Sequence, residues 1–195
     1  MFGTNDAQYA RMTSARRERR FAKSRGFTLI ELMIAVAMVG VLAALAIVGY
    51  RRYMEYSKSG DATAVLSAIR SAEESYRAET LSYLSCSPSL TSWYPAAPDG
   101  IKRHWLNPSH TNYACWRMLN VVTDSPTRYG FAVVAGGPGT AMPVPDTAQK
   151  PTWPSPTTEP WYVIQARGNN DGDTVYSMFL TSSLNGEVYS ESPDE

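Results

Sequence analysis

The chain has 195 residues, and its 18 basic and 18 acidic side chains give a formal net charge of zero. This length is enough for one domain with an extension and a hydrophobic core of useful size. Its 13 prolines, 13 glycines, 5 tryptophans and 12 tyrosines indicate a loop-rich β domain and exclude a wholly disordered chain.

The charge is unevenly distributed along the chain. Residues 1–26 carry seven basic and two acidic side chains, a net +5, and the remainder carries 11 basic and 16 acidic ones, a net −5. A basic segment before an apolar run orients a membrane helix with that end in the cytoplasm. A solvated tail that binds nucleic acid is the alternative. Because the apolar run follows directly and the remainder is acidic, we do not expect nucleic acid as the primary ligand.

The apolar run, residues 27–50, reads FTLIELMIAVAMVGVLAALAIVGY and contains one charged residue, Glu31. As a helix it would be about 36 Å long, enough to span a bilayer core of about 30 Å. A carboxylate inside a membrane costs about 2.5–3.5 kcal/mol on insertion scales. An ordinary secretory signal has a shorter apolar core and a small-residue cleavage site. A plain transmembrane anchor accounts for the length but leaves Glu31 unexplained.

The stretch RGFTLIELMIAVAMVGVLAALAIVGY resembles the N-terminal signature of type IV pilins and of the related secretion-system pseudopilins. Gly26 matches the glycine before the cleaved bond, Phe27 the new N-terminal residue, and Glu31 the glutamate at mature position five. The remainder of the chain resembles the family only in its layout. Family members often have proline at the position of Val48, whereas this chain has Gly40 and Gly49 in the run, which would loosen the helix or permit close helix packing.

The resemblance implies a specific processing route. A prepilin peptidase would remove residues 1–26 as a leader by cleaving between Gly26 and Phe27, and would methylate the Phe27 amine. Met12 is an alternative start for the leader. The subunit would then be held in the inner membrane as a single-pass protein with its head outside the cytoplasm, and later enter a surface filament. The implied partners are itself and other pilins, the peptidase, and an inner-membrane assembly platform with a cytoplasmic ATPase; no cofactor is implied.

The resemblance also offers a role for Glu31. In the family's assembly scheme, this carboxylate of an incoming subunit meets the Phe27 amine of the subunit already docked. A charge in a low-dielectric core is tolerable when paired and costly when alone. The contact would therefore favour docking in the correct register.

Residues 51–84 are predicted to form an amphipathic helix that continues the apolar one. Its apolar positions recur at three- and four-residue steps, with charged residues such as Arg70 and Glu73 between them. These apolar positions are Ala62, Val65, Leu66, Ile69, Ala72 and Tyr76. The Gly60-Asp61 pair marks either a capped restart or a tolerated glycine. We expect one nearly continuous helix from about Thr28 to Leu81.

The C-terminal part is predicted to form a small antiparallel sheet. Residues 85–127 indicate an irregular loop, and residues 128–195 a β-sheet head with a C-terminal tail. The expected strands are residues 128–135, 161–167, 173–181 and 186–190, with a Pro/Gly/Thr-rich linker before the second. The predicted fold class is α+β: a long N-terminal helix, membrane-spanning in its first half, with its C-terminal half packed on the sheet.

Cys86 and Cys115 are the two cysteines of the chain. In a domain exported from the cytoplasm, a disulfide between them is the natural interpretation. A zinc site that adds His104 and His110 is the alternative, although these gaps lack the close paired spacing of structural zinc sites.

Residues 169–173, NNDGD, place oxygen ligands close together, so Asn169, Asp171 and Asp173 are weak calcium candidates, with Asn170 between them. The EF-hand pattern is absent, and a hairpin turn is the simpler interpretation. The aromatic residues form either an adhesive surface or the filling of a small core, which we favour. They are Trp93, Tyr94, Trp105, Trp116, Trp153 and Trp161.

Catalytic motifs are not found: the sequence has no Gly-x-Ser-x-Gly, phosphate-binding glycine loop or His-Glu-x-x-His. We therefore predict a structural protein and not an enzyme: a major or minor pilin of a type IV pilus-like filament for adhesion or twitching motility. The alternative is a pseudopilin of type II secretion, and a more remote one is a membrane-anchored exported enzyme or binding domain.

Overall fold

The structure is a computed structural model of the chain and describes residues 26–170, 172 and 174–193. It contains two helices, α1 (Leu29–Thr80) and α2 (Tyr113–Leu119), and four strands, β1 (Tyr129–Gly136), β2 (Trp161–Gly168), β3 (Ser177–Ser182) and β4 (Tyr189–Glu191). The chain divides into two compact units after Ala44. The α+β class predicted from the sequence is confirmed.

The first unit contains the apolar start of α1. Every described residue from 26 to 44 is exposed, including the large apolar side chains. The segment Leu29–Arg51 is long and apolar enough to cross a membrane, judged by length and composition. A helix that is apolar on all sides needs an apolar environment, which the described residues of this unit do not supply.

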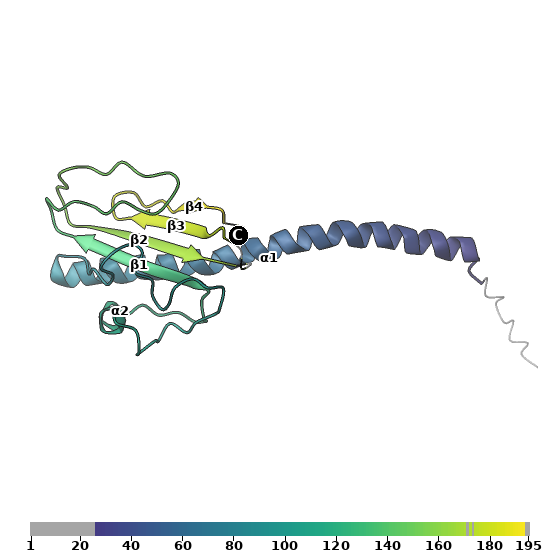
Figure 1. The fold of residues 1–195 in the computed structure, drawn as a ribbon, viewed down its shortest axis with the longest axis horizontal. Coiled ribbons are helices and arrows are strands. Elements are labelled where there is room, and N and C mark those ends of the chain that lie inside the picture. Colours follow the sequence, from purple (N-terminus) through teal and green to yellow (C-terminus); the bar gives the residue numbers. More distant parts are fainter. Residues whose placement is uncertain (1–25, 171, 173, 194–195) are drawn as a thin grey trace, which may run out of the picture. The chain divides into compact units, whose positions relative to one another are not determined.

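The second unit packs the amphipathic part of α1 on one face of the sheet (Figure 1). Ala62, Leu66 and Ile69 are fully buried at helical spacing, as their periodicity predicted. The strand order is β1-β2-β3-β4, and every neighbouring pair is antiparallel. The helix continues through Gly60 and Asp61, so this pair is a tolerated glycine and not a restart.

The sheet is buried on both faces. Alternate residues of β2, including Tyr162 and Ile164, enter the core beneath α1, whereas Trp161 and Val163 enter a second apolar cluster on the opposite face. Residues from the connection between β1 and β2 complete that second cluster, among them Met142 and half-buried Trp153. The segment interpreted as a linker loop therefore covers the outer face of the sheet.

Hydrogen bonds and an ion pair hold this covering segment to the sheet. The backbone N–H of Asp146 donates to Gln165 Oε1 at 3.3 Å, and the Asp146 carboxylate lies 3.5 Å from the Arg167 guanidinium. The N–H of Ala148 donates to the Glu191 carboxylate at 2.9 Å. Polar groups of β2 and β4 thus position a segment that has no helix or strand of its own.

Several predicted boundaries differ from those observed. The third strand begins at Ser177 and not at residue 173, and Tyr176 instead places its ring 3.6 Å from the Arg167 guanidinium carbon. The fourth strand begins at Tyr189 and not at residue 186. The predicted loop 85–127 contains α2, whose Trp116 and Leu119 are buried in the main core. A helix of seven residues is too short for periodicity to reveal it clearly.

Candidate functional site

The first element of the candidate site is the start of α1. Gly26, Phe27 and Thr28 precede the helix, and Phe27 is 82% exposed. The carbonyl of Thr28 accepts the first helical hydrogen bond, from the N–H of Leu32 at 3.2 Å. The hydroxyl of Thr28 accepts a second one from the N–H of Glu31, also at 3.2 Å. Thr28 is therefore the N-cap of α1.

The capping role of Thr28 was not predicted from the sequence, although the sequence contains a signal for it. A Thr followed three residues later by Glu is the capping-box pattern that marks a helix N-terminus. The same spacing places Glu31 in the first turn of α1, where a negative charge is favoured by the partial positive charge of the helix end. Glu31 thus follows Phe27 by four positions in the sequence and lies in the first turn of an exposed apolar helix.

The second element is the apolar surface of α1. The large side chains from Leu29 to Val48 are exposed, each with at least half of its surface accessible. Monomeric soluble proteins rarely expose such a continuous apolar area, which marks a membrane or protein contact. Added Cβ atoms on Gly40 or Gly49 would meet nothing within 4 Å, so neither glycine is required by packing within the described chain.

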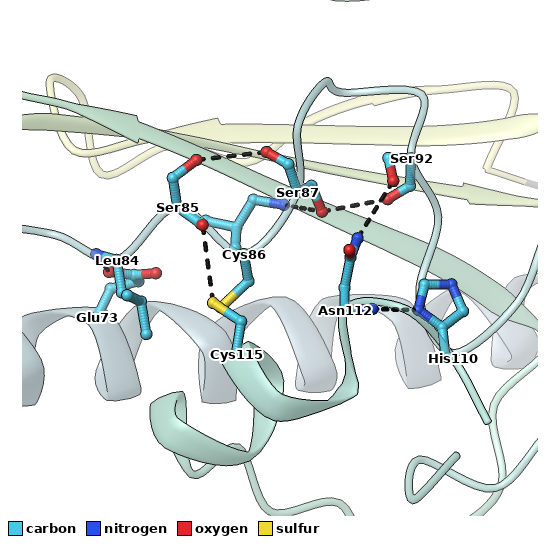
Figure 2. Close-up of a disulfide and its surroundings, with 10 residues drawn as sticks. Glu73, Leu84, Ser85, Cys86, Ser87, Ser92, His110, Asn112 and Cys115 are labelled. Atoms are coloured by element: carbon cyan, nitrogen blue, oxygen red, sulfur yellow. Dashed lines mark hydrogen bonds between the residues drawn. A yellow bond between two sulfur atoms is a disulfide. The ribbon is translucent and has the colours of Figure 1, made fainter. Parts of the chain in front are cut away.

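The third element is the disulfide between Cys86 and Cys115, which joins the chain leaving α1 to α2 (Figure 2). Next to it, the N–H of Ser87 donates to the Val133 carbonyl at 2.9 Å, so the same segment pairs with β1. Tyr94 forms a further bridge, with Phe131 of that strand. The bond therefore anchors α2 to a segment that is itself held on the sheet.

This arrangement contradicts the alternative prediction of a zinc site. Both sulfurs are consumed by the disulfide, and His104 is exposed. The ring of His110 lies 3.0 Å from the Trp93 carbonyl through Nε2, and its Nδ1 accepts from the N–H of Asn112 (Figure 2). Among the described residues, no group of three His, Cys, Asp or Glu side chains is arranged to hold a metal ion.

Of the calcium candidates, the structure describes Asn169 but not Asp171 or Asp173, which lie outside the described residues. The Asn169 side-chain oxygen accepts a hydrogen bond from the N–H of Gly172 at 2.7 Å. Gly172 has a φ of +87°, a conformation that favours glycine. The Asn169 side chain therefore stabilises a turn. Neighbouring Asn170 donates to the Tyr129 hydroxyl at 2.8 Å.

The aromatic residues fill the core and do not form a continuous exposed surface. Tyr94, Trp105, Trp116 and Trp161 are between 1% and 7% exposed. Tyr94 stacks on Trp116, and Trp105 meets both rings edge-on. Trp93 and Trp153 are half-buried. The favoured interpretation, a small aromatic core beneath the loops, accounts for these side chains.

Comparison with known proteins identifies the N-terminal segment. The family described as "Prokaryotic N-terminal methylation motif" matches residues 21–47. The chain is 46% identical over 57 residues to the type IV major pilin protein PilA of Myxococcus xanthus, which is 29% of this chain and 26% of PilA. It is 49% identical over 51 residues to a fimbrial protein of Pseudomonas aeruginosa, 26% of this chain and 33% of that protein.

The type IV major fimbrial protein FimA of Dichelobacter nodosus is 44% identical over 46 residues, 24% of this chain and 29% of FimA. The chain therefore matches about a quarter to a third of the length of these relatives. No solved structure matches the chain. The predicted resemblance of the N-terminal segment is confirmed: residues 21–47 match the N-terminal methylation motif, and the relatives that share this segment and its apolar helix are named as type IV pilin and fimbrial proteins.

Proposed function

We propose that this chain is a structural subunit of a type IV pilus-like filament, as a major or minor pilin. The observation that carries the proposal is the exposed apolar helix with a single carboxylate, Glu31, in its first turn. Relatives that share this segment are named as pilin and fimbrial proteins, which are structural proteins and not enzymes. The proposed role is therefore assembly and not catalysis.

Processing comes first in the proposed route. A prepilin peptidase hydrolyses the Gly26–Phe27 bond, which yields a carboxylate on Gly26 and an amine on Phe27. That amine is then methylated, in agreement with the name of the matching family. The subunit stays in the inner membrane through the segment Leu29–Arg51, and its folded head, which contains the disulfide, lies outside the cytoplasm.

Assembly follows when a cytoplasmic ATPase and its membrane platform move subunits into a helical filament with other pilins. In that filament the apolar surface of α1 is covered by other copies, which removes it from lipid without exposing it to water. Contacts between different surfaces of neighbouring copies that do not close into a ring generate such filaments. The sheet head and its loops then form the filament surface.

The proposal is tested by the N-terminus of the mature protein. Mass spectrometry of the protein from its native membrane should show a chain that starts at N-methylated Phe27. A chain that starts near Gly49 would indicate a cleaved secretory signal and refute the proposal, as would a mature protein that keeps the leader. A variant in which a bulky residue replaces Gly26 is the matched control. It should not be cleaved and should therefore retain the leader.

A pseudopilin of type II secretion is the second candidate, because the N-terminal resemblance is shared by both classes. Deletion of the gene separates them. A pilin predicts loss of surface fibres and of adhesion or twitching motility with normal protein secretion. Loss of secretion with intact fibres would instead identify a pseudopilin.

A further inference from the structure

We propose that Thr28 is a positioning residue for leader removal: as the N-cap of α1, it keeps the Gly26–Phe27 peptide bond outside the helix, where a peptidase can bind it as extended chain. The inference rests on the proposed function, because it takes the bond after Gly26 as the processing site. It concerns a residue on the substrate side of the reaction, two positions from the Gly26 carbonyl.

Two hydrogen bonds define Thr28 as the N-terminal boundary of α1. Its carbonyl accepts from the N–H of Leu32, and its hydroxyl accepts from the N–H of Glu31, each at 3.2 Å. An N-cap residue has a non-helical backbone while its carbonyl already serves the helix, so the helix stops at that residue. Phe27 and Gly26 accordingly lie outside the helix, and both are exposed.

The remaining neighbours do not mark this boundary. From Leu29 onward the chain is rich in leucine, alanine, methionine and isoleucine, which readily continue a helix. Phe27 itself neither caps nor breaks a helix. Gly26 resists helix formation by about 1 kcal/mol relative to alanine, but it stands on the leader side of the scissile bond and has no side chain that could cap the helix. Thr28 is the residue whose side chain separates Phe27 from the helix.

The helix boundary matters for cleavage because a peptide bond inside a helix is shielded. Its carbonyl is turned toward a hydrogen bond four residues later, and cleavage then depends on the population of locally opened chain. Gly26 lies outside the helix and is exposed, and within the described residues a Cβ added there would meet nothing within 4 Å. The cap thus presents the bond in an accessible state without prior unwinding.

The experiment compares three variants of the full chain, reconstituted in liposomes with the prepilin peptidase of its host. Thr28→Val keeps the size of the side chain but removes the acceptor. Thr28→Ser keeps the hydroxyl, and Thr28→Asn keeps an N-cap acceptor without a hydroxyl. Leader release is measured as kcat/KM, and the first helical residue of each uncleaved chain is located by NMR chemical shifts in detergent.

Thr28→Val should lower kcat/KM about fivefold, the factor that corresponds to a typical N-cap replacement, and its helix should extend to Phe27 or beyond. Thr28→Ser and Thr28→Asn should stay within about twofold of the original chain and keep the helix start at Leu29. If the peptidase instead contacted the Thr28 hydroxyl directly, Thr28→Asn, which lacks a hydroxyl, would not be cleaved at the original rate.

Three results would overturn the inference: unchanged cleavage of Thr28→Val, slower cleavage with an unmoved helix start, or rescue by serine but not by asparagine. The last would show that the peptidase recognises the hydroxyl itself. These failures differ from failure of the proposed function. If the unmodified chain is not cleaved after Gly26 at all, the processing proposal is wrong; if it is cleaved there, only the role of Thr28 is in question.

Discussion

The carboxylate of Glu73 on α1 accepts a hydrogen bond from the backbone N–H of Leu84, with 2.9 Å between Oε2 and the nitrogen. The bond ties the helix to the chain that returns after it, next to the Cys86–Cys115 disulfide (Figure 2). Glu73 is fully buried, and its Oε1 has no hydrogen-bond partner in the part of the chain that the structure describes. Its burial raises the pKa of Glu73 from 4.5 to about 7, although the Leu84 hydrogen bond opposes this shift.

Because its pKa is raised, Glu73 should make a contribution to the stability of the head that is less favourable at neutral than at acidic pH. Between pH 4.5 and about 7 the carboxyl is protonated in the folded chain and ionised in the unfolded chain. Unfolding then releases a proton, so stability falls as pH rises through this window and levels off above it. The total loss is about 3 kcal/mol.

Urea unfolding of the full chain in detergent, followed at several pH values, measures this effect. Glu73→Gln should remove most of the decrease between pH 4.5 and 7, because glutamine does not ionise. Glu79→Gln, on an exposed part of the same helix, is the matched control and should leave the decrease in place. An unchanged pH dependence in Glu73→Gln would show that Glu73 is not its source.

Loss of the disulfide should destabilise the head by about 3.5 kcal/mol, because the reduced unfolded chain gains the freedom of the loop that the bond closes. The bond joins residues 29 positions apart. The double variant Cys86→Ser, Cys115→Ser is compared with the oxidised protein by urea unfolding, with tryptophan fluorescence as the probe. The reduced original chain is the control and should match the double variant. Equal midpoints for oxidised and reduced protein would contradict the prediction.

Gly168→Ala should destabilise the sheet by about 1–3 kcal/mol, the usual cost of overpacking. Gly168 pairs with Tyr129 across β1 and β2, and an added Cβ would overlap the buried tyrosine ring. Movement of that ring would also disturb the hydrogen bond that its hydroxyl accepts from Asn170. The thermal unfolding midpoint measures the change. Gly137→Ala is the control, since its Cβ would meet nothing within 4 Å; equal midpoints for both variants would refute the packing argument.

Glu31→Ala should leave membrane insertion intact and prevent entry into the filament. Removal of the charge lowers the cost of placing the helix in lipid, but it also removes the proposed partner of the Phe27 amine. The amounts of the variant in the inner membrane and in sheared filaments are measured separately. Glu31→Gln, which keeps the size of the side chain, should behave in the same way. Normal assembly of either variant alongside unmodified subunits would rule out the role assigned to this charge.

The residues on which the proposed processing and assembly rest were recognisable in the sequence because their signals are local. The apolar run, its single glutamate and the Gly-Phe pair are contiguous, and the helix cap joins Thr28 to a residue three positions later. The disulfide between Cys86 and Cys115 could also be predicted from the sequence, because the chain contains two cysteines and therefore one possible pairing. The continuity of α1 followed from periodicity that repeats over many turns.

Other features depended on contacts between distant parts of the chain. Glu73 lies among the charged positions of an amphipathic helix, and its burial arises only because the chain folds back over it at Leu84. The Pro/Gly-rich segment that holds Met142 and Trp153 has no periodicity of its own, yet it packs on the outer face of the sheet against Trp161 and Val163. The helix α2 is short and is held by the disulfide and by the buried Trp116.

The amino-acid sequence alone thus determined that the N-terminal segment is an apolar helix with one carboxylate in its first turn and why it requires an apolar environment, because hydrophobicity, charge and capping act between near neighbours. Tertiary structure alone decided which side chains lose contact with water in the head. That outcome depends on which remote segments cover each face, as the buried carboxyl of Glu73 and the outer cluster around Trp161 show.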